Sequence, residues 1–237
     1  MSFRFKQFFV EDSRCAMKVG TDGVLLGRYA SVSQESCVRV LDIGTGSGLV
    51  ALMIAQRAPK AQIDAIDIDE AAAVQAQQNF QASPWSERLH AYAARLQEWK
   101  PEKKYDLIVS NPPYFNNSLK NPDKGRQIAR HTDSLNYEDL LEHSVRLLGE
   151  EGQLTLILPA EKEQEMRTLA ASYGLYMKRA VHVFSKTGKP AKRVIICFVR
   201  NTGKLESRNP EISTLILEDE KGHRSVAYQE LMNDFYL

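Results

Sequence analysis

Leu41-Asp-Ile-Gly-Thr-Gly-Ser-Gly48 is the stretch that decides the fold, because it links an apolar run over residues 37–43 to a helical pattern over residues 49–57. A buried strand, a glycine-rich turn and a helix form the opening unit of a parallel α/β sheet. Ligands of such sheets bind beyond the carboxyl ends of the strands. Gly44 and Gly46 suit that position, because glycine lets a ligand approach the main chain closely. Gly48 completes the glycine-rich turn.

Strand and helix patterns alternate along the rest of the chain. Further strands are predicted at residues 62–68, 88–93, 105–110, 152–158, 175–184 and 194–200. Helices are predicted at residues 70–82, 137–148 and 161–173. This order predicts a doubly wound α/β fold with a seven-stranded, mostly parallel sheet and helices on both faces. We expect a single domain over residues 1–237, with an N-terminal extension (1–34), a catalytic core (35–200), and a C-terminal hairpin and tail (201–237).

Two carboxylates indicate the kind of ligand. Asp42 lies two residues before the first glycine of the turn. A carboxylate there suits a cation better than a pyrophosphate, so S-adenosylmethionine, with its ammonium and sulfonium groups, is favoured over a dinucleotide of the dehydrogenase type. Asp67 ends the second strand, where a carboxylate can accept hydrogen bonds from both ribose hydroxyls. Asp64 and Asp69 are alternatives for that role, although Asp69 is expected to cap the next helix.

Residues 111–114 read Asn-Pro-Pro-Tyr and follow the apolar run 105–110. The side-chain oxygen of Asn111 can accept a hydrogen bond from a conjugated amino group, which is a poor nucleophile until its lone pair is freed. Pro112 and Pro113 lack a backbone N–H and stiffen the chain. Tyr114 offers an aromatic face for a flat base. We therefore expect Asn111, Pro112 and Tyr114 to be catalytic, and an ordinary proline turn is the alternative.

Basic residues gather in particular stretches although the net charge is only +1, from 31 basic and 30 acidic residues. Such clusters are either solvated surface charges or parts of one face that follows a phosphate backbone. His131, beside one cluster, could also contact RNA. The candidates for nucleic-acid binding are Lys120, Lys124, Arg126, Arg130, Lys186, Lys189, Lys192 and Arg193.

Other features of the sequence indicate the cellular location and the kinds of partner. No apolar stretch reaches membrane-spanning length. Cys15, Cys37 and Cys197 are widely separated and have neither zinc-ligand spacing nor a disulfide framework. We therefore expect a cytoplasmic protein with no metal, no membrane contact and no obligate protein partner.

The glycine turn with Asp42, Asp67 and the Asn-Pro-Pro-Tyr stretch resembles the class I methyltransferases. The class I methyltransferases that carry this tetrapeptide modify amino nitrogens of adenine, guanine or glutamine. The N-terminal block, Phe3-Arg-Phe-Lys-Gln-Phe8 and Cys15-Ala-Met-Lys-Val-Gly-Thr-Asp-Gly-Val-Leu-Leu-Gly27, resembles the bacterial tRNA1(Val) (adenine-37-N6)-methyltransferase family. The ending Asp234-Phe-Tyr-Leu237 resembles it too.

This resemblance implies methylation of adenine 37, next to the anticodon of a valine tRNA, with S-adenosylmethionine as the methyl donor. It also implies that Lys18, Thr21 and Asp22 lie near the cofactor, on an N-terminal segment that covers the pocket. The residues alone indicate less, since Gly20 to Gly23 is a turn by composition and Thr21 or Asp22 could cap a helix over residues 24–29.

One residue departs from the pattern of the related enzymes. They often carry an Asp after the third strand that binds the cofactor's adenine, and the matching position here holds Arg95. A backbone carbonyl or Gln97 could take over that role.

Two other classes of function stay open. An amino-group methyltransferase could act on ribosomal RNA, DNA or a protein glutamine, and the chain could also be a non-catalytic RNA- or cofactor-binding module.

Overall fold

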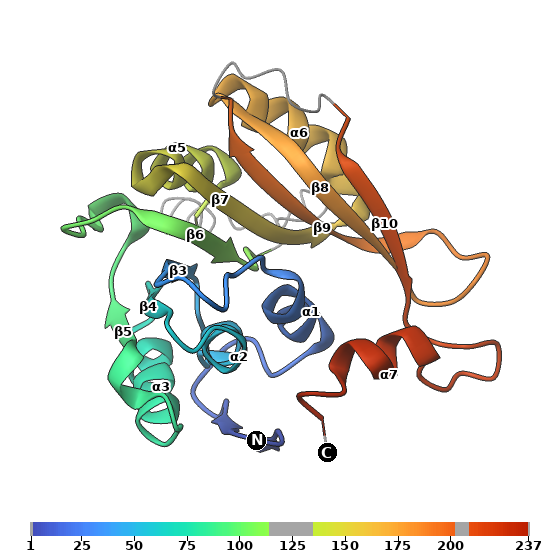
Figure 1. Ribbon diagram of the computed structural model, residues 1–237, viewed down its shortest axis with the longest axis horizontal. Helices are drawn as coiled ribbons and strands as arrows, with labels where there is room; N and C mark the ends of the chain where they lie inside the picture. The colour runs from blue at the N-terminus through green and yellow to red at the C-terminus, as the bar shows by residue number, and fades with distance from the viewer. Residues whose placement is uncertain (1, 114–134, 202–208, 237) are drawn as a thin grey trace, which may run out of the picture.

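The centre of the molecule is an eight-stranded sheet with the strand order β10-β8-β9-β7-β6-β3-β4-β5 (Figure 1). The computed structural model describes residues 2–113, 135–201 and 209–236. β9 runs antiparallel to its neighbours β7 and β8, and the other strand pairs of the sheet are parallel. The strands are β3 (Arg39–Ile43), β4 (Gln62–Asp67), β5 (Leu89–Ala93), β6 (Tyr105–Ser110), β7 (Leu148–Pro159), β8 (Leu175–Phe184), β9 (Ala191–Arg200) and β10 (Glu211–Ile216).

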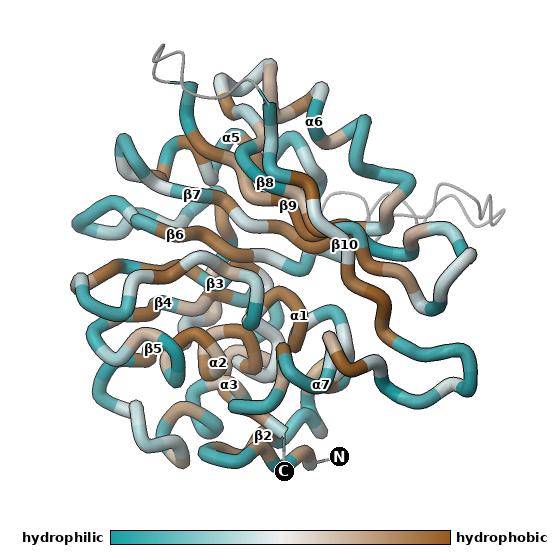
Figure 2. The backbone as a smooth tube through the Cα atoms, turned by 45° about the vertical axis from the view of Figure 1, so that its right-hand side comes forward, coloured by the Kyte–Doolittle hydropathy of each residue, from teal (hydrophilic) through white to brown (hydrophobic). Residues whose placement is uncertain are grey.

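Helices cover both faces of the sheet, because its central strands are apolar on both sides. Along β3, Val40 packs into the core on one face and Leu41 into the core on the other. The first face is covered by α1 (Thr21–Tyr29), α2 (Leu49–Arg57) and α3 (Glu70–Gln81), and the second by α5 (Tyr137–Leu147) and α6 (Glu163–Ser172). Figure 2 shows the strands as an apolar band between more polar outer segments. The predicted doubly wound α/β fold is confirmed.

The glycine-rich turn between β3 and α2 has the backbone conformation that its composition predicts. Gly44, Gly46 and Gly48 have φ angles of 69°, 55° and 80°, in the left-handed region that favours glycine. The backbone N–H groups of Gly44 and Thr45 donate to the carbonyl of Ile66 at 2.9 and 3.1 Å. The turn is therefore attached to the end of β4, and the ligand-binding ends of both strands are held together.

The first and last described segments of the chain lie side by side (Figure 1). A small hairpin of β1 (Ser2–Arg4) and β2 (Phe9–Glu11) precedes α1, and α7 (Val226–Met232) follows β10. The Lys6 N–H donates to the carbonyl of Phe235 at 2.8 Å, and Phe5 stacks on Phe8 and on Tyr236. We call this contact the terminal clasp. Its buried side chains Phe5, Phe8 and Phe235 belong to the same hydrophobic core as α2.

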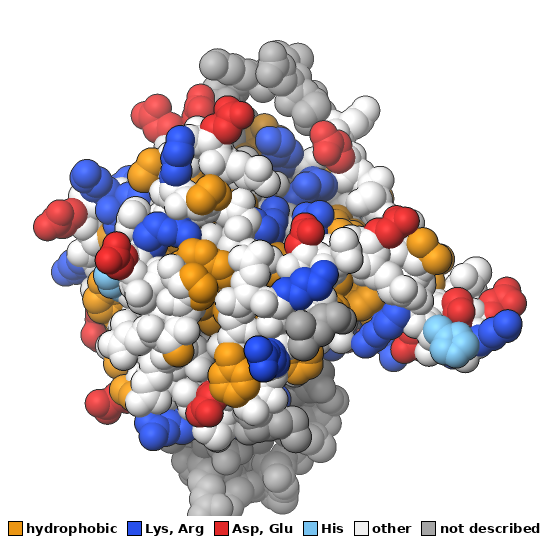
Figure 3. Space-filling view, turned by 60° about the horizontal axis from the view of Figure 1, so that its bottom comes forward, with side chains coloured by type: hydrophobic (Ala, Val, Ile, Leu, Met, Phe, Trp, Pro, Cys, Tyr) orange, Lys and Arg blue, Asp and Glu red, His pale blue; other side chains and the backbone are white. Residues whose placement is uncertain are grey.

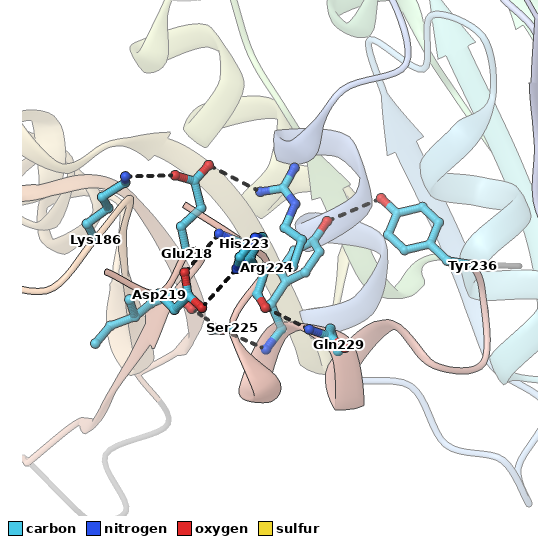
Figure 4. Close-up of polar contacts among 10 residues, drawn as sticks. Lys186, Glu218, Asp219, His223, Arg224, Ser225, Gln229 and Tyr236 are labelled. Atoms are coloured by element: carbon cyan, nitrogen blue, oxygen red, sulfur yellow. Dashed lines mark hydrogen bonds and ion pairs between the residues drawn. The ribbon is translucent and has the colours of Figure 1, made fainter. Parts of the chain in front are cut away.

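The C-terminal part differs from the prediction of a hairpin outside a seven-stranded sheet. β10 joins the sheet as its eighth strand, parallel to β8, with Glu211 opposite Arg179 and Ile216 opposite Phe184. The expected turn follows, closed by a bridge between Glu218 and Arg224. α7 then replaces the second strand of the hairpin, because Ser225 caps it by accepting the Tyr228 N–H at 3.1 Å (Figure 4).

Candidate active site

Two adjoining cavities lie at the carboxyl ends of β3, β4 and β6. Their volumes are about 380 and 470 Å³, within the range of roughly 300–1,000 Å³ usual for small-molecule sites. The larger one extends to the amino end of α1. Gly44, Gly46, Asn111 and Met17 line both cavities, so the glycine turn and the Asn-Pro-Pro segment lie at their junction.

Asp67 lies in the smaller cavity, as its position at the end of β4 predicts. Its carboxylate accepts the N–H groups of Gly46 at 2.8 Å and Asp69 at 3.0 Å. Burial raises the pKa of Asp67, while these N–H donors oppose the shift. Ile66 and Ile68 line the same cavity. A carboxylate fixed in this way beside apolar walls can bind the ribose of a nucleoside whose base packs on the walls.

The two alternatives to Asp67 have other roles. Asp69 is the N-cap of α3 and accepts the Ala71 N–H at 2.9 Å, which confirms its prediction as a cap. Asp64 accepts a hydrogen bond from the Tyr105 hydroxyl at 2.7 Å and pairs with Arg39 at 3.1 Å. It therefore belongs to a polar network at the opposite end of the strands.

The segment after β5 forms the far wall of the smaller cavity. Ala94, Arg95, Leu96 and Gln97 line it, and the Ala94 N–H donates to the Asp67 carbonyl at 2.9 Å. The Gln97 amide donates to Asp139 on α5 at 3.0 Å, so this side chain is held by the protein. Arg95 thus lines the wall, at the position where the resemblance implies an Asp.

Asp42 lies in the larger cavity and is 2% exposed. Its carboxylate accepts the Thr45 hydroxyl at 2.7 Å. Burial raises its pKa to about 7, and the neighbouring Asp67 adds to this shift. A buried carboxylate with a raised pKa next to a second carboxylate provides a site for a cation.

The space above the glycine turn is shaped for a ligand. A Cβ atom at Gly44 or Gly46 would have no atom within 4 Å, because both residues face the cavities. Gly48 differs, since a Cβ there would lie 2.4 Å from Phe80 Cε1, and Gly48 lines neither cavity among the described residues. Glycine at position 48 is therefore explained by packing against α3.

An N-terminal segment borders the larger cavity, where Lys18, Thr21 and Asp22 are among the lining residues. The Lys18 ammonium donates to the carbonyls of Asp12 at 2.7 Å and Cys15 at 3.0 Å, so it stabilises the loop over residues 12–18. Gly20, with no side-chain bond, is the N-cap of α1, so neither Thr21 nor Asp22 caps it.

Two contacts that the sequence did not predict hold this segment. Arg193 of β9 pairs with Asp22 at 2.8 Å. The Asn79 amide of α3 donates to the carbonyls of Glu11 and Ser47, both at 2.8 Å, and thereby joins β2 to the glycine turn. These partners are far apart along the chain, so no local pattern could have indicated them.

The Asn-Pro-Pro segment leaves β6 directly at the cavities. The Ser110 hydroxyl donates to the carbonyl of Ile43 at 2.8 Å, which fixes the end of β6 to the end of β3. Asn111 lines both cavities, while Pro112 and Pro113 line the smaller one. Tyr114 lies outside the described residues. Asn111 therefore lies where the two cavities meet.

The predicted nucleic-acid-binding residues are only partly described, since Lys120, Lys124, Arg126, Arg130 and also His131 lie outside the described ranges. Of the other four, Lys186 and Lys189 lie in the turn between β8 and β9, and Lys192 and Arg193 lie at the start of β9. Arg193 is opposite Pro159 of β7, so this turn is at the same end of the sheet as the cavities. Lys186 contacts Glu218 at 3.8 Å (Figure 4), and Lys189 and Lys192 are exposed. Figure 3 shows basic side chains of the described residues spread over one face, with acidic ones among them.

The described part of the chain contains no group of His, Cys, Asp and Glu side chains that could hold a metal ion. None of its helices is both long and apolar enough to cross a membrane.

Known structures that resemble this one define the class of its fold. The chain matches the crystal structure of a predicted O-methyltransferase, protein Atu636 from Agrobacterium tumefaciens, with a TM-score of 0.68 and 19% identity over 90% of this chain and 96% of that one. TrmN from Thermus thermophilus matches with a TM-score of 0.52 and 21% identity over 75% and 48% of the two chains. Together with the glycine turn and its two carboxylates, this fold is that of the class I methyltransferases.

Sequence comparison narrows the class to a family. Residues 29–187 match the Methyltransferase small domain family. A tRNA1(Val) (adenine(37)-N6)-methyltransferase of Parabacteroides distasonis is 47% identical, over 99% of this chain and 97% of the relative. One of Yersinia pseudotuberculosis is 42% identical, over 99% and 92%. The chain belongs to the family of the tRNA1(Val) (adenine(37)-N6)-methyltransferases, which confirms the resemblance seen in its sequence.

Proposed function

We propose that the protein transfers the methyl group of S-adenosylmethionine to N6 of adenine 37 in tRNA1(Val). The observation that carries the proposal is the position of Asn111 at the junction of the two cavities, at the end of β6. The names of the relatives supply the particular tRNA and nucleotide. Action on a tRNA implies a cytoplasmic location.

The two cavities suit the two halves of the cofactor. Asp67 and the wall formed by Ile68 and Leu96 would hold the adenosine part in the smaller cavity. Asp42 and the amino end of α1 would hold the cationic amino-acid part in the larger cavity. The open space above Gly44 and Gly46 would admit the ligand close to the main chain.

S-adenosylmethionine, when bound, supplies a methyl group on a sulfonium sulfur. The side-chain oxygen of Asn111 would accept a hydrogen bond from the adenine amino group, which draws the nitrogen lone pair out of conjugation. Pro112 and Pro113 would keep the backbone at this point stiff, and Tyr114 would stack on the base. The amine can lose its extra proton to water after transfer, so the mechanism requires no general base from the chain.

The adenine has to leave its stack to reach Asn111, at a cost of a few kcal/mol that is smaller in a loop than in a duplex. Lys189 and Lys192 are exposed at the same end of the sheet as the cavities. They would contact phosphates and thereby help to position the anticodon loop without reading its sequence.

Asn111→Ala removes the side-chain amide that is proposed to hold the reacting nitrogen. We expect the rate of methyl transfer to tRNA1(Val) to fall by about 100-fold or more, because the reacting nitrogen is no longer held in place. Cofactor affinity measured by calorimetry should change only a few-fold. Asn233→Ala, at an exposed position that lines neither cavity, is the matched control and should keep full activity. Full activity of Asn111→Ala would contradict the mechanism.

The substrate needs a separate test. Wild-type protein and radiolabelled cofactor are incubated with tRNA1(Val) transcripts that carry adenine or guanine at position 37, and with ribosomal RNA, DNA and protein release factors. We expect label only in the transcript with adenine 37, recovered as N6-methyladenosine by mass spectrometry. Label found in protein or DNA instead would refute tRNA as the substrate while leaving the methyltransferase class intact.

A further inference from the structure

Three arginine side chains come together at the carboxyl end of α1, away from the proposed cofactor site. Arg28 of α1, Arg57 of α2 and Arg179 of β8 line an open hollow of about 470 Å³. Ser31 and Gln153 also line it. The amino end of the nine-residue α1 lines the larger active-site cavity, so the hollow lies about 12 Å further along this helix.

Among the described residues, each guanidinium group donates hydrogen bonds from one of its nitrogens. Arg57 Nη1 donates to the carbonyls of Gly27 and Ala30 at 2.7 and 2.9 Å. Arg179 Nη2 donates to the Tyr29 carbonyl at 2.7 Å and the Ser31 hydroxyl at 3.0 Å. Arg28 Nε donates to the carbonyl of Leu231 at 2.9 Å. The groups are thus held in place by backbone carbonyls rather than by carboxylates.

The remaining nitrogens of these guanidinium groups stay available for a ligand. A guanidinium has five N–H donors, so most of them have no hydrogen-bond partner among the described residues. None of these nitrogens is among the buried polar atoms that lack a partner. The unpaired donors therefore face the hollow or solvent.

The described lining of the hollow contains three arginines and no carboxylate, although Glu211 of β10 lies opposite Arg179 in the sheet. In the described part of the chain, no carboxylate forms an ion pair with Arg28, Arg57 or Arg179. Burial lowers the pKa of Arg57 to about 10, and repulsion from the other two guanidinium groups adds to the effect. A bound anion would relieve this repulsion.

We propose that the hollow formed by Arg28, Arg57 and Arg179 binds a phosphate group. Guanidinium groups in a fixed orientation match the oxygens of phosphate, and the Ser31 hydroxyl adds a further polar group to the lining. The phosphate comes either from an RNA backbone or from a free phosphate ion. The RNA source rests on the proposed function, because a tRNA bound at the cavities would extend beyond them, whereas the phosphate site itself does not depend on it.

Calorimetric titration of the whole protein with sodium phosphate, against sodium chloride at equal ionic strength, tests the site without any methyl transfer. Arg28→Gln and Arg179→Gln each remove one guanidinium and leave Arg57, which binds two carbonyls at the end of α1, in place. Lys103→Gln removes the same charge from an exposed position outside the hollow and is the matched control. We expect both arginine variants to bind phosphate at least 10-fold more weakly than wild type and Lys103→Gln to bind it equally. Cofactor binding serves as the measure of correct folding.

The salt dependence of tRNA1(Val) binding distinguishes the two sources. If an RNA phosphate occupies the hollow, the plot of log affinity against log salt should become less steep by about 1 in each arginine variant. Its slope should stay unchanged in Lys103→Gln. Weaker binding of inorganic phosphate with an unchanged slope would assign the site to free phosphate. Wild-type behaviour of both arginine variants in both measurements would overturn the proposal.

Discussion

The fold buries the carboxyl group of Asp42, and burial disfavours its charged form. It is almost completely buried, and its pKa is raised to about 7. The folded protein therefore holds a proton that the unfolded chain has already lost, so the free energy of unfolding should fall as pH rises from about 4 to about 7. A cation beside Asp42 would stabilise the charged form and lower this pKa again.

This linkage gives a prediction for the pH dependence of cofactor binding. Between pH 5 and 7, the affinity for S-adenosylmethionine should rise with pH, with release of a proton from Asp42. The range stays below the ordinary pKa of an α-amino group, about 7.7–8.0, so the cofactor keeps its own charge. Calorimetry in buffers of different ionisation enthalpy measures the proton release.

Asp42→Asn is the control for this prediction, because it keeps the shape and removes the ionisable group. It should bind the cofactor more weakly at pH 7, with an affinity that varies much less with pH, and the cofactor-free variant should be more stable than wild type at pH 8. A wild-type affinity that stays constant from pH 5 to 7 would contradict this role of Asp42.

At the scale of residues, the sequence located the polar groups of the site but not their partners. Asp42, Asp67 and Asn111 lie at or just after the ends of parallel strands, where ligands bind, so position alone predicted that they face the cavities; their roles stay predictions. The pairing of Asp22 with Arg193 was missed, because 171 positions separate these residues. Arg193 was predicted to bind nucleic acid, which stays a prediction, and the structure adds its contact with the N-terminal segment.

At the scale of elements, the turn into α2 depends on one close contact. Gly48 has a φ of 80°, and a Cβ at this position would overlap Phe80 on α3. Gly174 has a similar φ of 72°, but a Cβ there would have no atom within 4 Å. The two glycines therefore separate the cost of the backbone conformation from the cost of overpacking.

We expect Gly174→Ala to lower the free energy of unfolding by about 1–2 kcal/mol, the cost of a left-handed residue with a side chain. Gly48→Ala should cost about 1–3 kcal/mol more, because Phe80 must also move. Urea denaturation of both variants measures the difference. Equal destabilisation would show that the packing of Phe80 tolerates the extra methyl group.

Local patterns predicted most elements of the sheet and its helices, since period and turn residues are properties of neighbouring positions. Residues 49–57 form the helix expected from their spacing, and residues 105–110 the expected strand. The pairing of β10 was not predictable in the same way. Its alternating pattern indicates a strand, but only the position of β8 in space determines that β10 joins the large sheet in parallel. α7 is too short, at seven residues, to show a clear helical period.

At the scale of the whole molecule, the terminal clasp closes the core beneath α2. Phe235 is 0% exposed, and its carbonyl accepts the Lys6 N–H. Lys6 also donates from its ammonium group to the carbonyl of Asn233 at 2.6 Å, and Gln56 of α2 to that of Asp234 at 2.8 Å. The N-terminal segment that borders the larger cavity is thus supported by residues from the opposite end of the sequence.

Phe235→Ala should therefore destabilise the entire domain rather than only its last turn. We expect a loss of about 3–5 kcal/mol in the free energy of unfolding, as for other fully buried phenylalanines. Phe9→Ala is the matched control, because Phe9 is 40% exposed and should cost far less. Denaturant unfolding followed by tryptophan fluorescence compares the two, since Trp85 packs against the neighbouring Phe8. Similar losses for both variants would show that the clasp adds little to the stability of the core.

The clasp also brings the first and last described segments of the chain into contact, since it joins residues 227 positions apart. A short peptide could connect the segments around Lys6 and Asn233 without moving either, and the chain could then be opened at another point. Gly188, exposed in the turn between β8 and β9, is such a point. In a circular permutant of this kind, β9 would begin the sequence and β8 would end it, while the eight strands keep their places in the sheet.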